Sequence, residues 1–247
     1  MKIDYNEFHR KTKIQYKIID RSNYTYFNVI RSIEKIPDIA HKSKLKILDY
    51  GCGAGTMSLY LASLGHSVIG VDISTKAIES ATNSGRHLHL KNVQFHTIDK
   101  SKDILKSETF DLVLCVEVLE HIRDDKSVLE MFNKVLKKHG KILITVPADS
   151  APLYKIGLLN SFDKEVGHLR RYSYDGLKSL IENSNFKVID ISVKESVFRN
   201  VLFCLPYFGF LIKFMKGIIS LFFMYTDKYL VKAFGGSNLY VLAQKNG

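Results

Sequence analysis

An acidic residue followed by three alternating glycines is the arrangement in this chain best suited to chemistry. Asp49, Gly51, Gly53 and Gly55 lie between a short apolar run and a helical pattern over 57–64. Glycines at such a turn let the backbone approach a ligand where any Cβ would collide. A helix that follows the turn directs its free N–H groups back at it. The spacing therefore predicts a ligand-binding turn between a strand and a helix.

Two ligand chemistries compete for this turn. A dinucleotide-binding turn follows Gly-x-Gly-x-x-Gly, with a pyrophosphate at the N-terminus of the helix. In this chain the last position of that template is Thr56, and Asp49 would place a negative charge beside the pyrophosphate. A carboxylate suits a ligand that carries an ammonium and a sulfonium. The residues therefore favour a positively charged cofactor over a nicotinamide dinucleotide.

An acidic residue also lies at the end of each of the next three predicted strands, or directly after it. These strands and their acids are 67–73 with Asp72, 93–98 with Asp99, and 110–116 with Glu117. Helical patterns separate the strands, which predicts a doubly wound, mostly parallel sheet. Ligands of such sheets bind beyond the carboxyl ends of the strands. One acid alone is often a turn former or a helix N-cap, whereas four in register with a glycine turn predict a shared site.

Together these segments resemble the cofactor-binding motifs of class I S-adenosylmethionine-dependent methyltransferases. The resemblance covers 45–146, and 167–193 more loosely. It implies an α/β fold with a doubly wound, seven-stranded mixed sheet, whose last two strands, 186–193 and 238–244, form an antiparallel hairpin. It also implies S-adenosylmethionine as the methyl donor and S-adenosylhomocysteine as its product.

The resemblance assigns a set of residues to this cofactor. Asp72 is expected to bind the ribose hydroxyls, Ile73 to lie against the adenine, and Asp99 to contact the adenine amino group. The whole expected set is Asp49, Gly51, Cys52, Gly53, Gly55, Asp72, Ile73, Asp99, Val116 and Glu117.

The residues expected to act on the methyl acceptor follow the fourth and fifth strands. The Glu-x-x-Glu-His of 117–121 resembles ubiquinone-biosynthesis O-methyltransferases, and 167–173 resembles the acceptor loop of a subgroup that also includes glycan-modifying enzymes. A histidine with a pKa near neutrality suits removal of a hydroxyl proton. His121 is the first candidate for this base and His168 the second. The candidate substrate-binding residues are Arg170, Arg171 and Tyr172.

Several alternatives remain open at this site. Arg170 and Arg171 either hold an anionic group of the acceptor or pair with acids on their own loop. If 117–121 is helical, Glu117, Glu120 and His121 share one face and could bind Mg²⁺ or Mn²⁺. The same Glu-His ending also occurs in methyltransferases that need no metal. No metal site is therefore predicted, although a divalent ion stays open.

The whole chain, 1–247, is expected to form a single methyltransferase domain with its cofactor-binding core at 45–147. A helical pattern over 28–36 stops at Pro37, and 1–43 is expected to form a helical cap. The resemblance implies that this cap covers the cofactor or shapes the acceptor site. A helix packed on the sheet edge is the alternative.

An apolar insertion, 197–234, separates the last two predicted strands. Pro206, Lys213 and Lys216 divide it into pieces that are too short to span a membrane. We expect helices that either contact an anionic membrane through 201–224 or cover a lipid-linked acceptor. Packing on the sheet or in a dimer interface is the alternative, and the oligomeric state is not predicted.

Composition limits the class of partner. The net charge is +11, but the basic residues are spread along the chain and show no nucleic-acid-binding signature, so no nucleic-acid partner is expected. The alternative explanation of the positive net charge is a general enrichment in lysine that serves no function. Cys52, Cys115 and Cys204 show neither metal-ligand spacing nor a disulfide framework. Reduced thiols indicate a cytoplasmic location, with peripheral contact at the inner face of the membrane left open.

These patterns predict an enzyme that methylates a hydroxyl group of a small or lipid-linked acceptor. Methylation of a nitrogen or a carboxylate remains open. Asp49 and Thr56 disfavour a nicotinamide-dependent oxidoreductase. The intact Asp49, Gly51, Gly53 and Asp72 disfavour an inactive binding module that only retains the fold.

Overall fold

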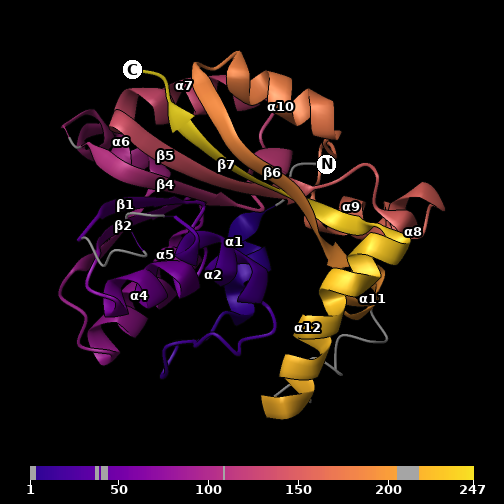
Figure 1. Ribbon diagram of the computed structural model, residues 1–247. Helices are drawn as coiled ribbons and strands as arrows, with labels where there is room; N and C mark the ends of the chain where they lie inside the picture. The colour runs from indigo at the N-terminus through magenta and orange to yellow at the C-terminus, as the bar shows by residue number, and fades with distance from the viewer. Residues whose placement is uncertain (1–3, 37–38, 40–43, 108, 205–216) are drawn as a thin grey trace.

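A seven-stranded sheet runs through the centre of the molecule (Figure 1). The computed structural model describes residues 4–36, 39, 44–107, 109–204 and 217–247. The strands are β1 (Lys46–Tyr50), β2 (Ser67–Asp72), β3 (Val93–Thr97), β4 (Phe110–Val116), β5 (Leu136–Pro147), β6 (Phe186–Ser196) and β7 (Gly236–Lys245). Their order is β3-β2-β1-β4-β5-β7-β6. Only β7 runs antiparallel to its neighbours, β5 and β6, which confirms the predicted mixed sheet and its terminal hairpin.

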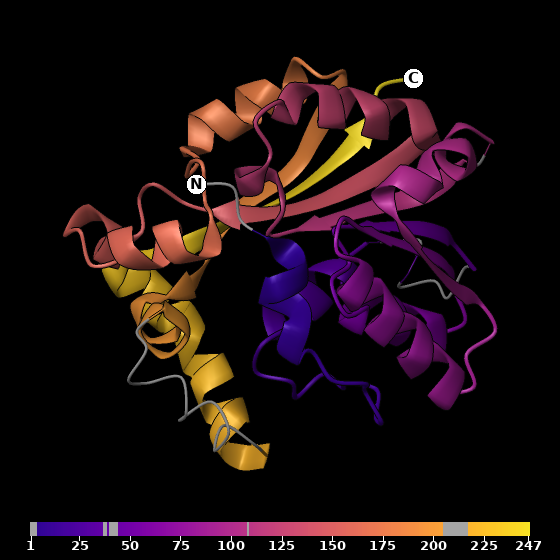
Figure 2. The same ribbon diagram turned by 180° about the vertical axis from the view of Figure 1, so that it is seen from behind.

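Helices cover both faces of this sheet, as Figures 1 and 2 show from opposite sides. One layer contains α2 (Phe27–Glu34), α4 (Thr56–Ser63) and α5 (Thr75–His87). The other layer contains α6 (Ile98–Ser107), α7 (Asp125–Val135) and α10 (Tyr174–Glu182). The predicted doubly wound arrangement is therefore confirmed.

Strand β4 shows how the sequence builds a core on each face. Leu112 and Leu114 pack in a cluster with residues of α2 and α4, whereas Val113 and Cys115 pack in a cluster with residues of α7 and α10. Successive side chains of a strand point to opposite faces. A central parallel strand therefore needs an uninterrupted apolar run, which 112–115 supplies.

The remaining helices lie near the carboxyl ends of the strands or extend from the sheet. They are α1 (Tyr5–Phe8), the 3-10 turn η1 (His9–Lys11), the 3-10 turn η2 (Leu119–His121), α8 (Pro152–Lys155), α9 (Asn160–Val166), α11 (Val197–Cys204) and α12 (Gly217–Phe234). The predicted helical insertion is confirmed by α11 and α12, while Pro206, Lys213 and Lys216 lie outside the described residues. Among the helices described here, none is long and apolar enough to cross a membrane.

The sequence pattern predicts a helix over 125–138, a turn at Gly140 and a strand over 141–146, and two of these boundaries are wrong. Helix α7 ends at Val135 and β5 already begins at Leu136, so Gly140 lies inside a strand and not in a turn. A Cβ at Gly140 would lie 3.0 Å from the Lys137 carbonyl oxygen and 3.2 Å from that of Phe110. The glycine therefore allows close backbone approach at the start of a long strand, which its sequence context does not reveal.

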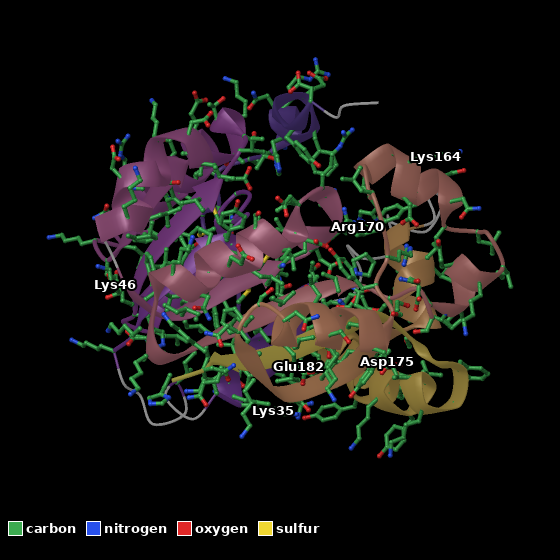
Figure 3. The ribbon with its side chains drawn as sticks, turned by 90° about the horizontal axis from the view of Figure 1, so that it is seen from above. Lys35, Lys46, Lys164, Arg170, Asp175 and Glu182 are labelled. Carbon is green, nitrogen blue, oxygen red and sulfur yellow. The ribbon has the colours of Figure 1, made fainter. Side chains whose placement is uncertain are left out.

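The basic side chains do not all gather at one place. Lys35, Lys46 and Lys164 lie on different sides of the molecule (Figure 3). The absence of a nucleic-acid partner stays a prediction from the sequence.

Phe132 of α7 offers a test of the core. Its side chain is fully buried and its ring packs edge-on against Tyr50 at a centroid distance of 5.1 Å. Substitution Phe132→Ala is expected to lower the free energy of unfolding by about 3–5 kcal/mol, because it removes buried apolar area and leaves a cavity. Urea unfolding measures this loss. The exposed Ile189 provides the control, since Ile189→Ala should change the value by less than about 0.5 kcal/mol.

Candidate active site

The glycine turn joins β1 to α4 in a shape that requires glycine. Gly51 has φ +77°, and a Cβ there would lie 2.3 Å from Cγ2 of Val118. Gly55 has φ +78° and precedes α4 as its N-cap, where a Cβ would lie 2.7 Å from the Phe95 ring. Residues with a Cβ resist positive φ. The turn therefore brings the backbone close to the carboxyl edge of the sheet.

Asp72, at the end of β2, ties two connections together. One carboxylate oxygen accepts the Gly53 N–H at 2.8 Å, and the other accepts the Ser74 N–H at 2.8 Å. Ionised carboxylate oxygens have further acceptor positions, so Asp72 can also receive ligand hydroxyls. This geometry supports the ribose-binding role that the sequence predicts.

Asp49 lies beneath the turn as a buried carboxyl group. The Ser58 hydroxyl of α4 donates a hydrogen bond to it at 2.5 Å. Burial, partly offset by this hydrogen bond, raises the pKa of Asp49 to about 6. A buried carboxylate without a positive partner is costly. A cationic group bound at the turn would therefore stabilise the charged form of Asp49.

The other expected cofactor residues surround this turn. Ile73 is 60% exposed beside Asp72, so its side chain has surface to offer a planar ring. Cys52 is half-buried and its thiol donates to the Gly53 carbonyl. The strand expected over 93–98 stops at Thr97, so Asp99 lies two residues beyond its end, in the first turn of α6.

The N-terminal segment covers the turn. The Asn6 side-chain oxygen accepts from the hydroxyls of Ser74 and Thr75, at 3.0 and 3.1 Å. The Gln15 amide donates to the Ala54 carbonyl and to the Thr56 hydroxyl, at 3.0 and 2.9 Å. Helix α1 thus lies beside α5 (Figure 2). The N-terminal segment thus covers the turn, whereas α2 packs on the face of the sheet with Leu112, Leu143 and Tyr240, and not on the sheet edge.

A cavity of about 340 Å³ adjoins the turn at the carboxyl edge of the sheet. Its apolar walls include Val29, Val116, Phe162 and Val166. Its polar lining includes Glu117, Glu120, His121, His168, Arg171, Glu195, Arg199, Asn238 and Tyr240. Sequence reasoning had singled out the first five of these polar residues. Val116, which the sequence assigns to the cofactor, lines this cavity.

His121 presents one ring nitrogen to the cavity. Its Nδ1 lies 3.1 Å from the Gly167 carbonyl oxygen, and because a carbonyl only accepts, Nδ1 carries the proton in this contact. Nε2 is left as an acceptor, 3.6 Å from a Glu120 oxygen. Burial lowers the pKa of His121. The imidazole is therefore neutral near pH 7, as a base requires.

His168 is oriented by an acid. Its Nδ1 lies 2.9 Å from Asp163, and its Nε2 lies 3.8 Å from Glu120. Although burial opposes it, hydrogen bonds from His168 and Arg171 lower the pKa of Asp163 to about 2. The ionised Asp163 therefore fixes His168 with its Nε2 towards the cavity. The two predicted histidines lie together, with ring centroids 5.0 Å apart.

Two glutamates give the cavity its electrostatic character. Glu120 is fully buried, and neither of its oxygens accepts a hydrogen bond from a described residue. Burial and the charge of Glu117 raise the pKa of Glu120 well above its usual value. Burial and the charge of Glu195 raise the pKa of Glu117 to about 7. Both carboxyl groups therefore favour a proton or a cationic partner.

The arrangement of possible metal ligands differs from the expected one. Glu117 has φ +55° and lies outside η2, so it does not share a helical face with Glu120 and His121. Instead Glu120, His121 and His168 each offer a ligand atom within 4.8 Å of the others. The buried, unbonded oxygens of Glu120 and the two facing Nε2 atoms suit a divalent ion. The residues therefore fit a metal, with His168 replacing Glu117 in the set.

Arg170 and Tyr172 do not line the cavity, contrary to expectation. Arg170 and the Tyr172 hydroxyl each contact Asp125 at 2.7 Å, and Tyr172 is buried. These two residues hold the 167–173 loop against the start of α7. Arg171 does reach the cavity, but it donates two hydrogen bonds of 2.7 Å to Asp163, which is the pairing alternative raised from the sequence.

Two further residues of the site, Arg199 in the cavity lining and Tyr5 beside His121, could not be identified from motifs. Arg199 of α11 donates to the Tyr24 and Thr25 carbonyls and lies 3.5 Å from Glu195. Tyr5 of α1 packs edge-on against His121 at a centroid distance of 5.9 Å. The sequence gives one indication of a role for Arg199, because it is a charged residue inside a largely apolar insertion. It gives no indication of a role for Tyr5.

Comparisons with known proteins agree with this site. The family model described as "Methyltransferase domain" matches residues 41–196. A ubiquinone biosynthesis O-methyltransferase of Rickettsia akari is 28% identical over 159 residues, which are 63% of this chain and 62% of that protein. The corresponding protein of Pelagibacter ubique is 33% identical over 125 residues, 50% of this chain and 51% of that protein. This chain thus matches less than two thirds of each relative's length.

Solved structures resemble the fold at low sequence identity. The magnesium protoporphyrin IX methyltransferase of Synechocystis, with bound S-adenosylhomocysteine, superposes with a TM-score of 0.64 at 14% identity, covering 98% of this chain and 94% of that one. The [4+2]-cyclase SpnF superposes with a TM-score of 0.58 at 18% identity, covering 87% and 82%. Because one fold carries different reactions, the site residues must decide the chemistry.

Asp49 provides a test of the buried turn. Its folded pKa of about 6 exceeds the ordinary 3.8, so the stability it contributes is present below pH 4 and lost as pH rises through 6. Between pH 4 and pH 6, the free energy of unfolding of the wild type minus that of Asp49→Asn should therefore fall by about 1.4 kcal/mol per pH unit. Urea unfolding of both proteins at pH 5, 6 and 8 measures the difference. A difference that stayed constant with pH would contradict the assignment.

Proposed function

Because the chain belongs to the family of class I S-adenosylmethionine-dependent methyltransferases, we propose that it methylates a hydroxyl group on a small or lipid-linked acceptor. The observation that carries the acceptor assignment is the pair of imidazole Nε2 atoms, of His121 and His168, that face Glu120 in the cavity. His121 and His168 both present Nε2 there, while their Nδ1 atoms contact Gly167 and Asp163. A hydroxyl acceptor needs such a base, whereas an amine can be methylated without one.

The cofactor is expected to bind along the glycine turn. Asp72 would receive the ribose hydroxyls, and Asp49 and Glu117 carry the negative charge that suits its ammonium and sulfonium groups. Burial has raised the pKa of both of these acids, so a bound cation would restore their charged forms. Electrostatic complementarity to a cationic cofactor is therefore built into this edge of the sheet.

The acceptor is expected to occupy the cavity. Apolar walls formed by Val29, Phe162 and Val166 suit an acceptor with an apolar body, such as a prenylated phenol. The relatives in Rickettsia akari and Pelagibacter ubique are named for ubiquinone biosynthesis, which supports an acceptor of this class. The cavity lies next to the turn, so acceptor and methyl group can meet at its boundary.

Methyl transfer is an in-line displacement at carbon. The acceptor oxygen forms a bond to the methyl carbon, while the carbon–sulfur bond breaks and sulfur keeps the electron pair as S-adenosylhomocysteine. The hydroxyl proton passes to Nε2 of His121 or His168. Holding oxygen and carbon about 3 Å apart supplies most of the rate enhancement. If Glu120, His121 and His168 instead held a divalent ion, their Nε2 atoms would be ligands and not bases, and the ion would act as a Lewis acid that lowers the pKa of the acceptor hydroxyl.

The cofactor assignment is tested by isothermal titration with S-adenosylhomocysteine, with NADH as the control ligand. We expect micromolar binding of S-adenosylhomocysteine and none of NADH. Substitution Asp72→Ala should abolish binding, because it removes the ribose acceptor and the anchor for the Gly53 and Ser74 N–H groups. Binding of NADH alone would overturn the assignment. Asp175→Ala, an exposed acid on α10, is the matched control and should bind like the wild type.

The base assignment is tested by methyl transfer to a panel of prenylated phenols. His121→Gln and His168→Gln should each lower kcat, and the residue that acts as the base should lose about 10²–10⁴-fold while cofactor binding is retained. Because burial lowers the pKa of His121, the wild-type rate should be flat near neutrality and fall only below pH 6.5. His87→Gln, on an exposed face of α5, is the control. Full turnover in both variants would refute a histidine base.

A further inference from the structure

Helix α12 carries a row of exposed aromatic side chains. Phe222, Tyr225 and Tyr229 are 63%, 64% and 67% exposed. Their spacing of three and four residues places them on one face of the helix. Soluble proteins rarely expose large aromatic groups side by side, so Tyr225 and Tyr229 mark this side of the helix as a candidate interaction surface.

Two lysines accompany these aromatic groups, and no exposed acid does. Lys228 is exposed three positions after Tyr225, and Lys232 is exposed three positions after Tyr229, so each lysine lies beside the aromatic row on the helix surface. The one acidic residue of the helix, Asp227, is 7% exposed and accepts hydrogen bonds from Ser196. The outward side of α12 is therefore aromatic and positively charged.

The opposite side of α12 is fixed to the protein. Met224 is buried in a cluster with Tyr24, Phe27 and Leu202, and the helix contacts β6 and α11. Figure 1 shows α12 extending away from the sheet. Because the inner side is held by packing, the aromatic and basic side is presented in a constant orientation.

We propose that this side of α12 docks on an anionic membrane surface. Tyrosine has an apolar ring and a polar tip, and such groups gather at the membrane–water boundary. Lysine can extend its ammonium group to lipid phosphates while its stem lies along apolar surface. Aromatic and basic residues on one side of a helix are the features by which helices bind in the plane of an anionic bilayer.

Charge argues against a second copy of the chain as the occupant. Each copy carries a net charge of +11, and a symmetric contact through α12 would bring the lysines of both copies together. Like charges facing each other oppose association, whereas an anionic lipid surface complements them. The surface therefore fits lipid better than it fits itself.

Docking through α12 would bring the acceptor cavity towards the bilayer. Helix α11 packs against α12, and its Arg199 and Asn200 line the cavity. A lipid-linked acceptor could then reach the site from the membrane. The docking surface does not depend on methyl transfer, because none of its residues lines the cavity.

The test is co-flotation of the full chain with phosphatidylcholine vesicles that contain or lack phosphatidylglycerol. We expect partitioning onto the anionic vesicles and little onto the neutral ones. Tyr225→Ser/Tyr229→Ser and Lys228→Gln/Lys232→Gln should each reduce partitioning about 10- to 30-fold. Lys178→Gln/Lys187→Gln, with the same change in charge on α10 and β6, is the control and should partition nearly like the wild type.

Three results would overturn the proposal. Equal partitioning of the α12 variants and the lysine control would show that only net charge matters. Absence of flotation with anionic vesicles would remove the membrane surface altogether. Light scattering that shows a dimer, dissociated by Tyr225→Ser/Tyr229→Ser, would assign the surface to a second copy. Titration with S-adenosylhomocysteine reports separately whether each variant is folded and whether the cofactor assignment stands.

Discussion

The two backbone N–H groups on the Asp72 carboxylate are the interaction on which the rest of the site depends. Gly53 donates from the first strand-to-helix connection and Ser74 from the second, so one side chain fixes both turns. Ser74 also caps α5 and donates to Asn6 of α1. The glycine turn, the start of a helix and the N-terminal cover are thereby held in one fixed relation before any ligand binds.

The cofactor side of the molecule was predictable because its signals are local. The bounds of β4 match the predicted 110–116, since its apolar run needs two buried faces and ends at an acid. The adjacent residues likewise predict Ser173 as the N-cap of a helix over 174–183, and the structure confirms it with α10 at Tyr174–Glu182. The backbone conformation of Glu117 was not predicted, because nothing in the sequence reveals its φ of +55°. This dihedral angle keeps Glu117 off the helical face that carries Glu120.

The acceptor side could not be predicted to the same extent because its contacts are distant in sequence. Tyr5 reaches His121 across more than a hundred residues, and Arg199 reaches the Tyr24 carbonyl across an even longer separation. Arginine spacing likewise could not distinguish Arg171, which meets Asp163 at the cavity wall, from Arg170, which meets Asp125 behind it. Motifs identify the residue types, whereas packing decides which of them share a cavity.

The charges of the cavity also match the proposed reaction. Arg171 is paired with Asp163, and Arg199 lies beside Glu195, so neither arginine neutralises Glu117 and Glu120 completely and both glutamates have raised pKa values. Methyl transfer removes the positive charge from sulfur and releases a proton from the acceptor. If an imidazole Nε2 beside Glu120 takes that proton, a positive charge is present near the same carboxyl groups before and after transfer. Because burial raises their pKa values, these carboxyl groups become charged when a cation lies beside them, so the same groups can stabilise the sulfonium before transfer and the imidazolium after it.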